Sequence, residues 1–458
     1  MKKVILYITI LSAALAGCQK HSVDLIQGQT VDERLRAAYA QYTSILTKAQ
    51  YGWKLVETGG TAFNNGAYDS AKATFVYHLQ FNDSNTVTMF GSFDTVQAKT
   101  PRTSGYRLSA QQRPTLIFDT YSYIHVPCDP DPAVSKSPLS PGSGWGTDFE
   151  FMFVDNVLPD QLGDTIRLVG LKNNATAYMV RATKDEKGLL DNGQYAANLN
   201  AINSKFLTYW QRFTIGTTVY ELPAIDFTLK TIAINWLDGS GNLQTFRTLF
   251  WIDFNGNMIF VDPFVNGNVI IKGFTSSLNL IGTNVPASVA ITPAIAPLKL
   301  DVNAAQNWYT QMGFNFNNCW VSAKAFHVNG VDDFCKFGAI TNYQSLWYAG
   351  PSVFGGTSEG LITFTGSLAA PYCFSKVPFT VNAGIARFTL LSSSSTGFTG
   401  TGAVAVAMTS ARNIMYGGAT AGTSFQDWYF VPTSSTGKNY DMVRVSDALA
   451  WISWRPRS

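Results

Sequence analysis

The stretch from Arg113 to Phe151 holds residues whose types and spacing are suited to chemistry. Several carboxylates close together can share a Ca²⁺ ion, which takes about six to eight oxygen ligands, and two of them can act as a general acid and base. An aromatic ring beside them can stack on a ligand ring. The candidate residues for ligand or cation binding are Asp119, His125, Asp129, Asp131, Trp145, Asp148 and Glu150.

Two predicted strands flank a long loop in this stretch. The apolar run at residues 115–118 predicts a buried strand, and the alternation at residues 147–154 predicts a second strand with Asp148 and Glu150 on one face. The prolines between the two strands disfavour regular structure. Long loops without structure of their own are often functional, so we expect this loop to bring its own acidic residues toward those of the second strand.

Three interpretations of the loop stay open. In the first, the carboxylates face solvent and Trp145 packs the loop as a structural cover. In the second, the carboxylates bind a cation, with Ca²⁺ as the possible cofactor, or a glycan. In the third, a pair such as Asp148 and Glu150 catalyses hydrolysis. The structural interpretation is the simplest, because carboxylates usually lie at the protein surface, and the sequence assigns no catalytic residue.

The motifs of this stretch resemble a known family. The run RPTLIFDTYSYIH, the DPDP sequence after it, and the segments GSGW and TDFEF are similar to an uncharacterised lipoprotein family of the Bacteroidota, the family of domain of unknown function 4302. The resemblance weakens toward the C-terminus. It implies an outer-membrane lipoprotein near polymer-uptake systems of the starch-utilisation type, and it carries over no catalytic residue.

The N-terminus has the pattern of a lipoprotein signal peptide. Residues 1–17 start with Lys2 and Lys3, continue with an apolar centre and end in the small residues before Cys18. This pattern predicts cleavage after residue 17, lipidation of Cys18 with palmitate-type acyl chains, and a lipidated tether at residues 18–29. The apolar run is too short to span a bilayer. Membrane lipid is therefore an expected partner, at either the cell surface or the periplasmic face of the outer membrane.

Composition limits the classes of function. The formal net charge of +3 falls by two when Lys2 and Lys3 are removed, so nucleic-acid binding has no electrostatic support. Hydrophobic residues make up 46% of the 458 residues and charged residues 14%, which favours folded domains with large cores over disorder. Aromatic residues at 14%, together with 38 Gly, are typical of a protein with many strands.

Period-2 segments separated by turns predict a mainly β fold. We expect tandem antiparallel β-meander units, barrel-like or half-barrel-like, each led by a short amphipathic helix. The first helix begins after Thr30, which has capping-box spacing to Glu33. The second helical face runs from Leu199 to Phe213. The expected units are residues 30–190 and 191–297, followed by a C-terminal β-rich domain at residues 298–458.

Further patterns refine the second unit and the C-terminal domain. The Pro- and Ala-rich residues 285–297 predict a linker between them. In the C-terminal domain, residues 303–312 predict a short helix, and the alternation at residues 404–408 predicts a strand. Residues 238–242, DGSGN, look like a fragment of a calcium loop, but their place between two strand patterns predicts a hairpin turn.

A weak internal repeat is suggested by two similar segments. FNDSNTVTMF begins at Phe81 and FNGNMIFV begins at Phe254, and each follows an aromatic amphipathic helix pattern. Either the chain repeats one helix-plus-meander unit, or two ordinary hairpins share favourable turn residues. Both interpretations stay open.

Four cysteines remain beyond Cys18 and permit three full pairings, of which a disulfide between Cys319 and Cys335 is preferred because a hairpin could join them. The other two are Cys128 and Cys373. With four His and neither a CxxC nor an HExxH motif, a zinc site is not expected.

These observations predict an outer-membrane-anchored lipoprotein that acts as a non-catalytic binding or accessory protein in nutrient uptake. Its ligand would be a glycan or a peptide, and its protein partner an outer-membrane transporter. Two alternatives are a carboxylate-dependent hydrolase, which leaves the question of enzymatic activity open, and a structural subunit of an envelope complex.

Overall fold

The computed structural model describes residues 30–60, 73–110, 113–137, 142, 144–154, 164–315, 319–351, 359–365, 368–375, 380–393, 402–434 and 438–456. The predicted signal peptide, the lipidation site at Cys18 and the tether lie outside these residues. In the part of the chain that is described, no helix combines the length and the apolar character needed to cross a membrane.

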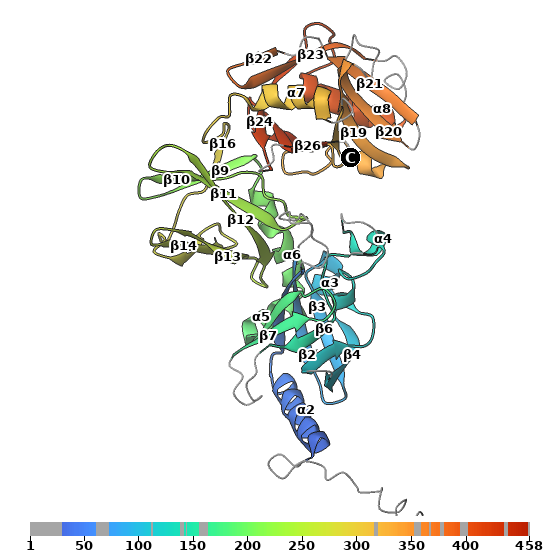
Figure 1. The fold of residues 1–458 in the computed structure, drawn as a ribbon, viewed down its shortest axis with the longest axis vertical. Helices are drawn as coiled ribbons and strands as arrows, with labels where there is room; N and C mark the ends of the chain where they lie inside the picture. The colour runs from blue at the N-terminus through green and yellow to red at the C-terminus, as the bar shows by residue number, and fades with distance from the viewer. Residues whose placement is uncertain are drawn as a thin grey trace, which may run out of the picture. The chain divides into compact units, whose positions relative to one another are not determined.

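The protein is mainly β, as the sequence predicts, and its strands form three antiparallel sheets. Contacts divide the chain into two compact units. The first comprises residues 1–69, 77–93 and 100–187, and the second comprises residues 70–76, 94–99 and 188–458. Most of the barrel strands, blue to blue-green in Figure 1, belong to the first unit, whereas the green to red sheets belong to the second.

The predicted first helix is confirmed. Helix α2 spans Val31–Thr47, and the capping box between Thr30 and Glu33 is formed in both directions. The buried Tyr42 ring of α2 lies 4.2 Å from the ring of Phe153, so the helix packs on the barrel through its aromatic face. Near the end of α2, the carbonyl of the buried Leu46 accepts a hydrogen bond from the Trp53 indole at 3.0 Å.

Eight strands close a barrel in sequence order, because β1 pairs with β8 from Trp53↔Arg181 to Thr58↔Thr176. Side chains fill the interior of eight-stranded barrels of this size. Here the fully buried rings of Phe81, Phe118 and Phe151 contact one another at 6.4 Å between successive centroids. The barrel strands are β1 (Trp53–Thr58), β2 (Thr74–Phe81), β3 (Thr86–Gly91), β4 (Arg102–Ala110), β5 (Pro114–Phe118), β6 (Glu150–Phe153), β7 (Thr165–Gly170) and β8 (Thr176–Arg181), with helix α3 (Thr95–Lys99) between β3 and β4.

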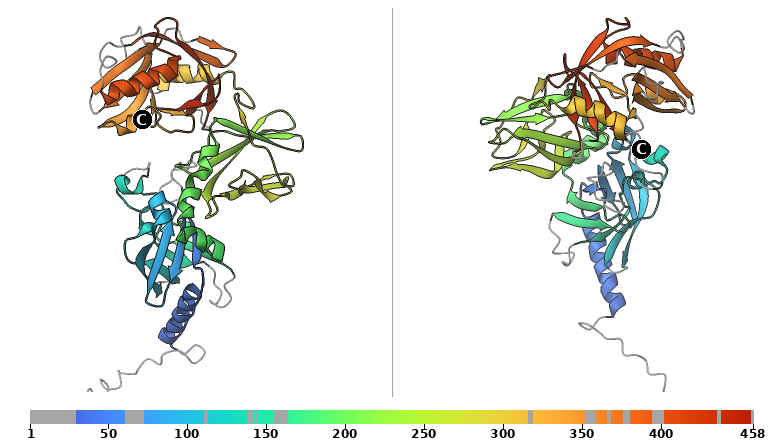
Figure 2. Two further views of the ribbon diagram at one scale, coloured as in Figure 1. Left: turned by 180° about the vertical axis from the view of Figure 1, so that it is seen from behind. Right: turned by 45° about the horizontal axis from the view of Figure 1, so that its top comes forward.

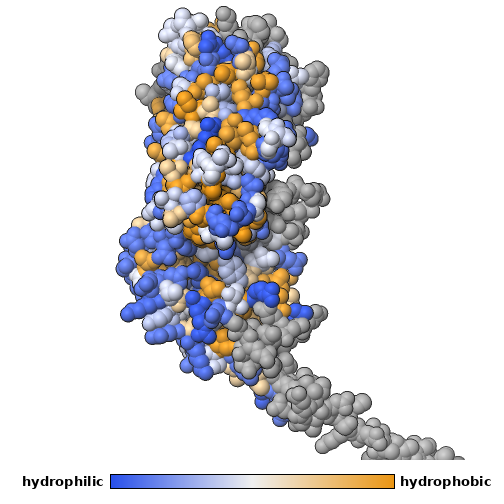
Figure 3. Space-filling view, turned by 90° about the vertical axis from the view of Figure 1, so that its left-hand side faces the viewer, coloured by the Kyte–Doolittle hydropathy of each residue, from blue (hydrophilic) through white to orange (hydrophobic). Residues whose placement is uncertain are grey.

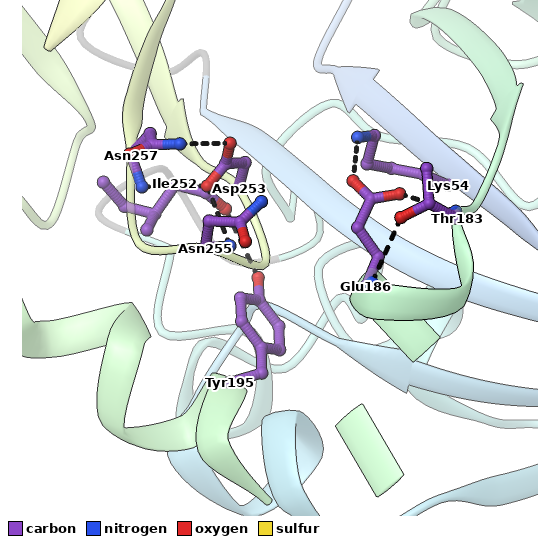
Figure 4. Close-up of polar contacts among 8 residues, drawn as sticks. All are labelled: Lys54, Thr183, Glu186, Tyr195, Ile252, Asp253, Asn255 and Asn257. Carbon is purple, nitrogen blue, oxygen red and sulfur yellow. Dashed lines mark hydrogen bonds and ion pairs between the residues drawn. The ribbon is translucent and has the colours of Figure 1, made fainter. Parts of the chain in front are cut away.

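A capping box also begins helix α5 (Lys184–Asp191), directly after the barrel. The Glu186 N–H donates to the Thr183 hydroxyl, and the Thr183 N–H donates to the Glu186 carboxylate at 2.9 Å. Lys54 of β1 reaches the other carboxylate oxygen at 2.5 Å (Figure 4). This ion pair therefore ties the start of α5 to the first barrel strand.

The second sheet has eight strands in the order β15-β14-β13-β12-β11-β10-β9-β16. The expected helical face from Leu199 to Phe213 is only partly right. The helix α6 ends at Ala201, a short 3-10 turn follows at Asn203–Lys205, and Trp210 already lies in β9. The elements are α6 (Gln194–Ala201), β9 (Trp210–Ile215), β10 (Thr218–Leu222), β11 (Thr231–Leu237), β12 (Leu243–Ile252), β13 (Met258–Asn266), β14 (Val269–Phe274), β15 (Leu280–Thr283) and β16 (Thr292–Ala294).

The Pro- and Ala-rich segment at residues 285–297 is not a free linker. Its residues Thr292–Ala294 form β16, the edge strand that pairs with β9. Arg212 of β9 pairs with the buried Glu221 at 2.8 Å and also donates to the Ala296 carbonyl. Edge strands tolerate proline because one side of the strand needs no donor, which is why this composition resembled a linker.

The predicted hairpin turn at residues 238–242 is confirmed, and the same turn occurs elsewhere. The Asp238 carboxylate accepts the backbone N–H groups of Ser240 and Asn242, and the turn joins β11 to β12. The Asp253 carboxylate accepts those of Asn255 and Asn257 in the same way (Figure 4). Such side-chain bonds to residues two and four positions ahead satisfy the turn without a cation.

Asn82 makes the equivalent turn between β2 and β3, with its side-chain oxygen accepting from Ser84 and Thr86. Asn82 therefore corresponds to Asp253, so the two turns do not align when Phe81 is placed opposite Phe254. The similarity between the two segments comes from shared turn chemistry.

The third sheet also closes on itself, because β17 pairs with both β19 and β26. Trp308 of α7 fills its core: its ring lies 4.9 to 6.3 Å from rings on five strands. Helix α8 packs against β21, β23 and β24 (Figure 2). The elements are α7 (Ala304–Asn315), β17 (Cys319–Ser322), β18 (Phe326–Val328), β19 (Tyr343–Ala349), β20 (Glu359–Thr365), β21 (Leu368–Ser375), β22 (Thr380–Asn382), β23 (Ile385–Ser393), α8 (Ala403–Tyr416), β24 (Phe425–Pro432), β25 (Tyr440–Arg444) and β26 (Ala450–Pro456).

Two sequence predictions for this domain differ from the structure. Residues 404–408 lie in α8, because the alternating apolar residues continue into an alanine-rich helix. The expected disulfide is absent: Cys319 and Cys335 are both free thiols and lie in different apolar clusters, as the core clusters of this domain show.

The surface mixes polar and apolar character. On the face in Figure 3, hydrophobic residues form separate patches among hydrophilic ones. Scattered exposed apolar residues are normal in folded proteins and need no functional explanation one by one.

Candidate functional site

The loop between β5 and β6 has more regular structure than its prolines suggest. A 3-10 turn spans Tyr123–His125, and the short helix α4 spans Pro132–Ser135. Pro132 occupies the first turn of α4, where its missing N–H costs nothing, and Asp131 caps this helix by accepting the Ala133 N–H at 2.8 Å. Asp131 is therefore a structural capping residue.

Hydrogen bonds tie the inner side of the loop to the barrel. Trp145 is buried and donates its indole N–H to the Ser135 carbonyl at 2.7 Å. Asp148 is also buried, and its carboxylate accepts backbone N–H groups from the β7–β8 turn: Lys172, Asn173 and Ala175, at 3.0 to 3.1 Å. A Cβ on Gly170 would lie 1.9 Å from this carboxylate, so glycine is required there.

Asp148 does not share a strand face with Glu150. The strand β6 begins at Glu150, and Asp148 lies before it in the barrel closure. Burial raises the pKa of Asp148, although its backbone hydrogen bonds act in the opposite direction. A carboxylate that already accepts three backbone N–H groups is a structural anchor, and it is poorly placed to serve as a general acid or base.

A second buried carboxyl, which the sequence gave no reason to choose, lies beside this anchor. Glu57 of β1 is fully buried, and its Oε1 accepts the Asp148 N–H at 2.7 Å. Burial raises the pKa of Glu57 well above its ordinary value. Neither the Glu57 Oε2 nor the hydroxyl of the buried Tyr77 has a hydrogen-bond partner within the described residues. Such unpaired polar atoms inside the apolar barrel lower the stability of the folded state.

His125 has a structural role in the outer part of the loop. Its Nδ1 accepts the Ser122 N–H at 3.1 Å, so its Nε2 carries the proton and donates to the Phe118 carbonyl at 3.1 Å. Burial lowers the pKa of His125, so the ring is neutral at pH 7. Because both ring nitrogens already form hydrogen bonds, His125 can make further contacts with its neighbours only through its ring faces.

Three rings stack outward from this point. The Phe149 ring lies 4.6 Å from the His125 ring, and the Tyr121 ring lies 5.5 Å from His125 at an interplanar angle of 25°. Tyr121 is the outermost ring and is 45% exposed. Its hydroxyl donates to Asp129 at 2.5 Å, and burial and this bond raise the pKa of Tyr121 to about 12. An exposed aromatic ring is thus fixed in place by a stack and a hydrogen bond.

Charged residues border this ring. The guanidinium of Arg102 lies 6.0 Å from the Tyr121 ring centroid. Asp129 receives the Tyr121 hydroxyl on one oxygen and the Asp131 N–H on the other, and it retains lone pairs for further donors. We call Arg102, Tyr121 and Asp129 the Tyr121 surface.

The remaining predicted site residues lie apart from this surface or serve the fold. Asp119 pairs with Arg107 at 2.8 Å in an exposed position, where ion pairs contribute little. Glu150 is half-buried in β6, opposite Ile117. Within the described residues, no group of three or more His, Cys, Asp or Glu side chains is placed to hold a metal ion. The structure brings together His125 and Asp129, and it joins them with Tyr121 and Arg102, which the sequence did not single out.

A comparison with protein-family models shows to which family the barrel region is related. The model of domain of unknown function 4302 matches residues 26–277, more than half of the chain. The chain belongs to the DUF4302 family. The match includes every barrel strand and therefore the whole Tyr121 surface.

The DUF4302 match ends inside the second sheet. Strands β15 and β16 follow residue 277 and complete this sheet, and the second sheet then packs against the third through Tyr209, which donates to Asp441 at 2.7 Å. The C-terminal sheet is therefore part of the same compact unit as the end of the family region.

Other comparisons add no functional information. No curated protein matches the chain. Among solved structures, it is similar to Aeromonas veronii immune modulator A, with 9% identity over 89% of this chain and 93% of that one and a TM-score of 0.18. It is also similar to the beta subunit of DNA polymerase from Streptococcus pyogenes, with 8% identity over 93% and 98% and a TM-score of 0.17. Scores this low carry no argument about fold or function.

Proposed function

We propose that this DUF4302 protein is a lipid-anchored envelope protein that binds polymer fragments, glycan or peptide, without transforming them. Binding takes place at the Tyr121 surface, and the protein serves an uptake system of the outer membrane. The observation that carries the proposal is that Tyr121 is 45% exposed yet held by a ring stack and a hydrogen bond.

A fixed aromatic ring favours binding because little conformational entropy is lost when a ligand covers it. Tyr121 presents an apolar ring face beside a charged donor, Arg102, and an acceptor, Asp129. Ligand sites commonly combine aromatic contact with a few polar groups that fix orientation. This combination suits both a sugar ring and a side chain of an extended peptide.

The use of the other carboxylates supports binding over catalysis. Asp131 caps a helix, Asp148 anchors the barrel closure and Asp119 pairs with an arginine. A hydrolase of the kind considered from the sequence needs two carboxyl groups that are free to act on one bond. The structural roles of these residues leave the Tyr121 surface as the better supported site.

The anchoring part of the proposal rests on the sequence before and including Cys18. Removal of the signal peptide and acylation of this cysteine would fix the protein to a membrane. With an outer-membrane transporter as partner, such a protein would hold fragments close to the pore. A Cys18→Ala variant should then appear in the soluble fraction, whereas wild-type protein stays with membranes; equal distribution of the two would contradict the anchor.

The test of binding is a screen of mature protein against immobilised oligosaccharides and extended peptides. Wild-type protein and Arg387→Gln, an exposed change elsewhere, should bind the same ligands, and Tyr121→Ala should bind none of them. Retained binding by Tyr121→Ala would move the site away from this surface. Release of shortened products during the screen, abolished by Glu150→Gln, would instead favour a hydrolase.

A further inference from the structure

Arg102 is an exposed guanidinium without a carboxylate partner among the described residues. Other arginines are paired: Arg107 with Asp119, Arg212 with Glu221, Arg387 with Asp427 and Arg444 with Asp447. The Arg102 guanidinium lies 6.0 Å from the centroid of the Tyr121 ring. A cation left free beside an exposed aromatic ring is available to a ligand.

The placement of Arg102 relative to Tyr121 is fixed by the backbone. Arg102 begins β4, and it pairs with Met89 of β3. Three hydrogen bonds then tie this segment to the start of the β5–β6 loop: Ser104 hydroxyl to Thr120 carbonyl, Asp119 N–H to Gly105 carbonyl, and Tyr123 hydroxyl to Thr100 carbonyl. The arginine and the tyrosine are therefore held in register before any ligand arrives.

The charge of Arg102 acts on two rings of the stack, His125 and Tyr121. Burial is the main cause that lowers the pKa of His125, and the positive charge of Arg102 lowers this pKa further. The same charge opposes the rise of the Tyr121 pKa that burial and Asp129 cause. The Arg102 guanidinium lies 6.0 Å from the centroid of the exposed Tyr121 ring, which is consistent with this effect.

From this geometry we propose that the ligand is an acidic glycan, whose sugar ring stacks on Tyr121 while its carboxylate pairs with Arg102. This inference rests on the proposed function and names its substrate class. The carboxylate of a uronic acid is bonded directly to the pyranose ring, so one residue can span the short distance between the aromatic ring and the guanidinium. Guanidinium groups match carboxylates with two parallel hydrogen bonds.

Asp129 favours a sugar over a peptide at this surface. Its remaining lone pairs accept hydrogen bonds from donors, which a sugar supplies as hydroxyl groups around the same ring. A second acidic group at this position would be repelled, so the ligand should carry its charge on one side only. A peptide that ends in an aromatic residue carries a ring and a carboxylate too, and it is the alternative that the experiment separates.

The experiment is isothermal titration calorimetry of mature protein with tetragalacturonic acid and with its methyl ester, which keeps the rings and removes the charge. Maltotetraose and a tetrapeptide ending in tyrosine are further probes. We expect wild-type protein to bind the acid about tenfold more tightly than the ester, a difference that high salt reduces. Arg102→Gln should bind the two equally, and Arg387→Gln should behave as wild type.

The outcomes separate the two proposals. Equal binding of acid and ester by wild-type protein, or a preference that survives in Arg102→Gln, overturns the acidic-glycan inference and leaves the binding function standing. Binding of the peptide, but not of the glycans, in an Arg102-dependent way also overturns it. If none of the four probes binds and the wider screen finds no ligand, the proposed function itself fails.

Discussion

Two exposed aromatic residues in this protein each have an arginine beside them, and the two pairs differ in how the nearest carboxylate is used. Phe425 in the C-terminal sheet is 47% exposed, and the Arg387 guanidinium lies 3.9 Å from its ring centroid. Asp427 binds Arg387 with two hydrogen bonds of 2.7 Å. Tyr121 in the barrel is exposed to a similar degree, but Arg102 lies farther away and has no carboxylate partner in the part of the chain that the structure describes.

The carboxylates have different partners in the two regions. At Tyr121 the hydroxyl donates to Asp129, which also accepts the Asp131 N–H and forms no ion pair with Arg102 among the described residues. Phe425 has no hydroxyl, so Asp427 satisfies Arg387, and its hydrogen bond raises the pKa of the guanidinium. The same three kinds of residue thus produce a closed surface pair in one region and an open site in the other. Availability of the charged groups, rather than exposure alone, distinguishes a binding surface.

The largest effect is expected when the aromatic ring itself is removed. Tyr121→Ala should weaken binding of the acidic tetrasaccharide at least about tenfold, because a central aromatic anchor dominates a small site. Phe425→Ala should change affinity less than about twofold, since its pair is already satisfied. Calorimetry of both variants checks this, and a larger loss in Phe425→Ala would reverse the assignment of the two regions.

A smaller change converts the open pair into the closed type. In Tyr121→Phe the ring stays and one Asp129 oxygen loses its donor, while the other still accepts the Asp131 N–H; we expect the released oxygen to compete for Arg102. We expect the preference for the acid over its methyl ester to fall severalfold while neutral binding stays near wild type. An unchanged preference would show that the hydroxyl does not control Arg102.

Stability is expected to depend on pH through His125, which stacks on Tyr121. Burial lowers the pKa of His125 below its ordinary value of 6.5, so the unfolded chain takes up the proton first as the pH falls. Stability that is present above about pH 6.5 is therefore lost as the pH drops below this value.

Thermal unfolding between pH 7.5 and pH 5 measures this effect. The midpoint of wild-type protein should decline more steeply than that of His125→Gln, which keeps a hydrogen-bond donor but does not titrate. Parallel curves would mean that His125 is not neutral beneath Tyr121.

The smallest effect is expected at the closed pair. Asp427→Asn removes the charge that satisfies Arg387, yet the guanidinium still covers one face of the Phe425 ring, 3.9 Å from its centroid. We expect no new binding of the acidic tetrasaccharide in Tyr121→Ala/Asp427→Asn by calorimetry. New affinity in this double variant would show that a free arginine beside an aromatic residue is sufficient.

Local features of the fold were predictable from the sequence, because they depend on residues close along the chain. The capping box of Thr30 and Glu33 and the turn that begins at Asp238 are both present as expected. Local patterns failed where tertiary packing decides: residues 404–408 alternate like a strand but lie in α8, and Trp210 continues a helical spacing but lies in β9.

The candidate site was predictable only in part. The carboxylates of this stretch predict a site, and Asp129 and His125 do both contact Tyr121. The roles of Asp131 and Asp148 as backbone anchors depend on which N–H groups the fold brings near them, and sequence does not show this. Arg102 lies on another strand, so only the register between β4 and the loop reveals its place.

The most direct test of the account is NMR of mature protein labelled with ¹³C in its tyrosine rings, with the Tyr121 signal assigned by its loss in Tyr121→Phe. During titration with tetragalacturonic acid, we expect the Tyr121 ring signals to shift most, in a saturable way, and Arg102→Gln to weaken the response. Saturable shifts at other tyrosines with Tyr121 unmoved would contradict the claim that this ring is the binding surface.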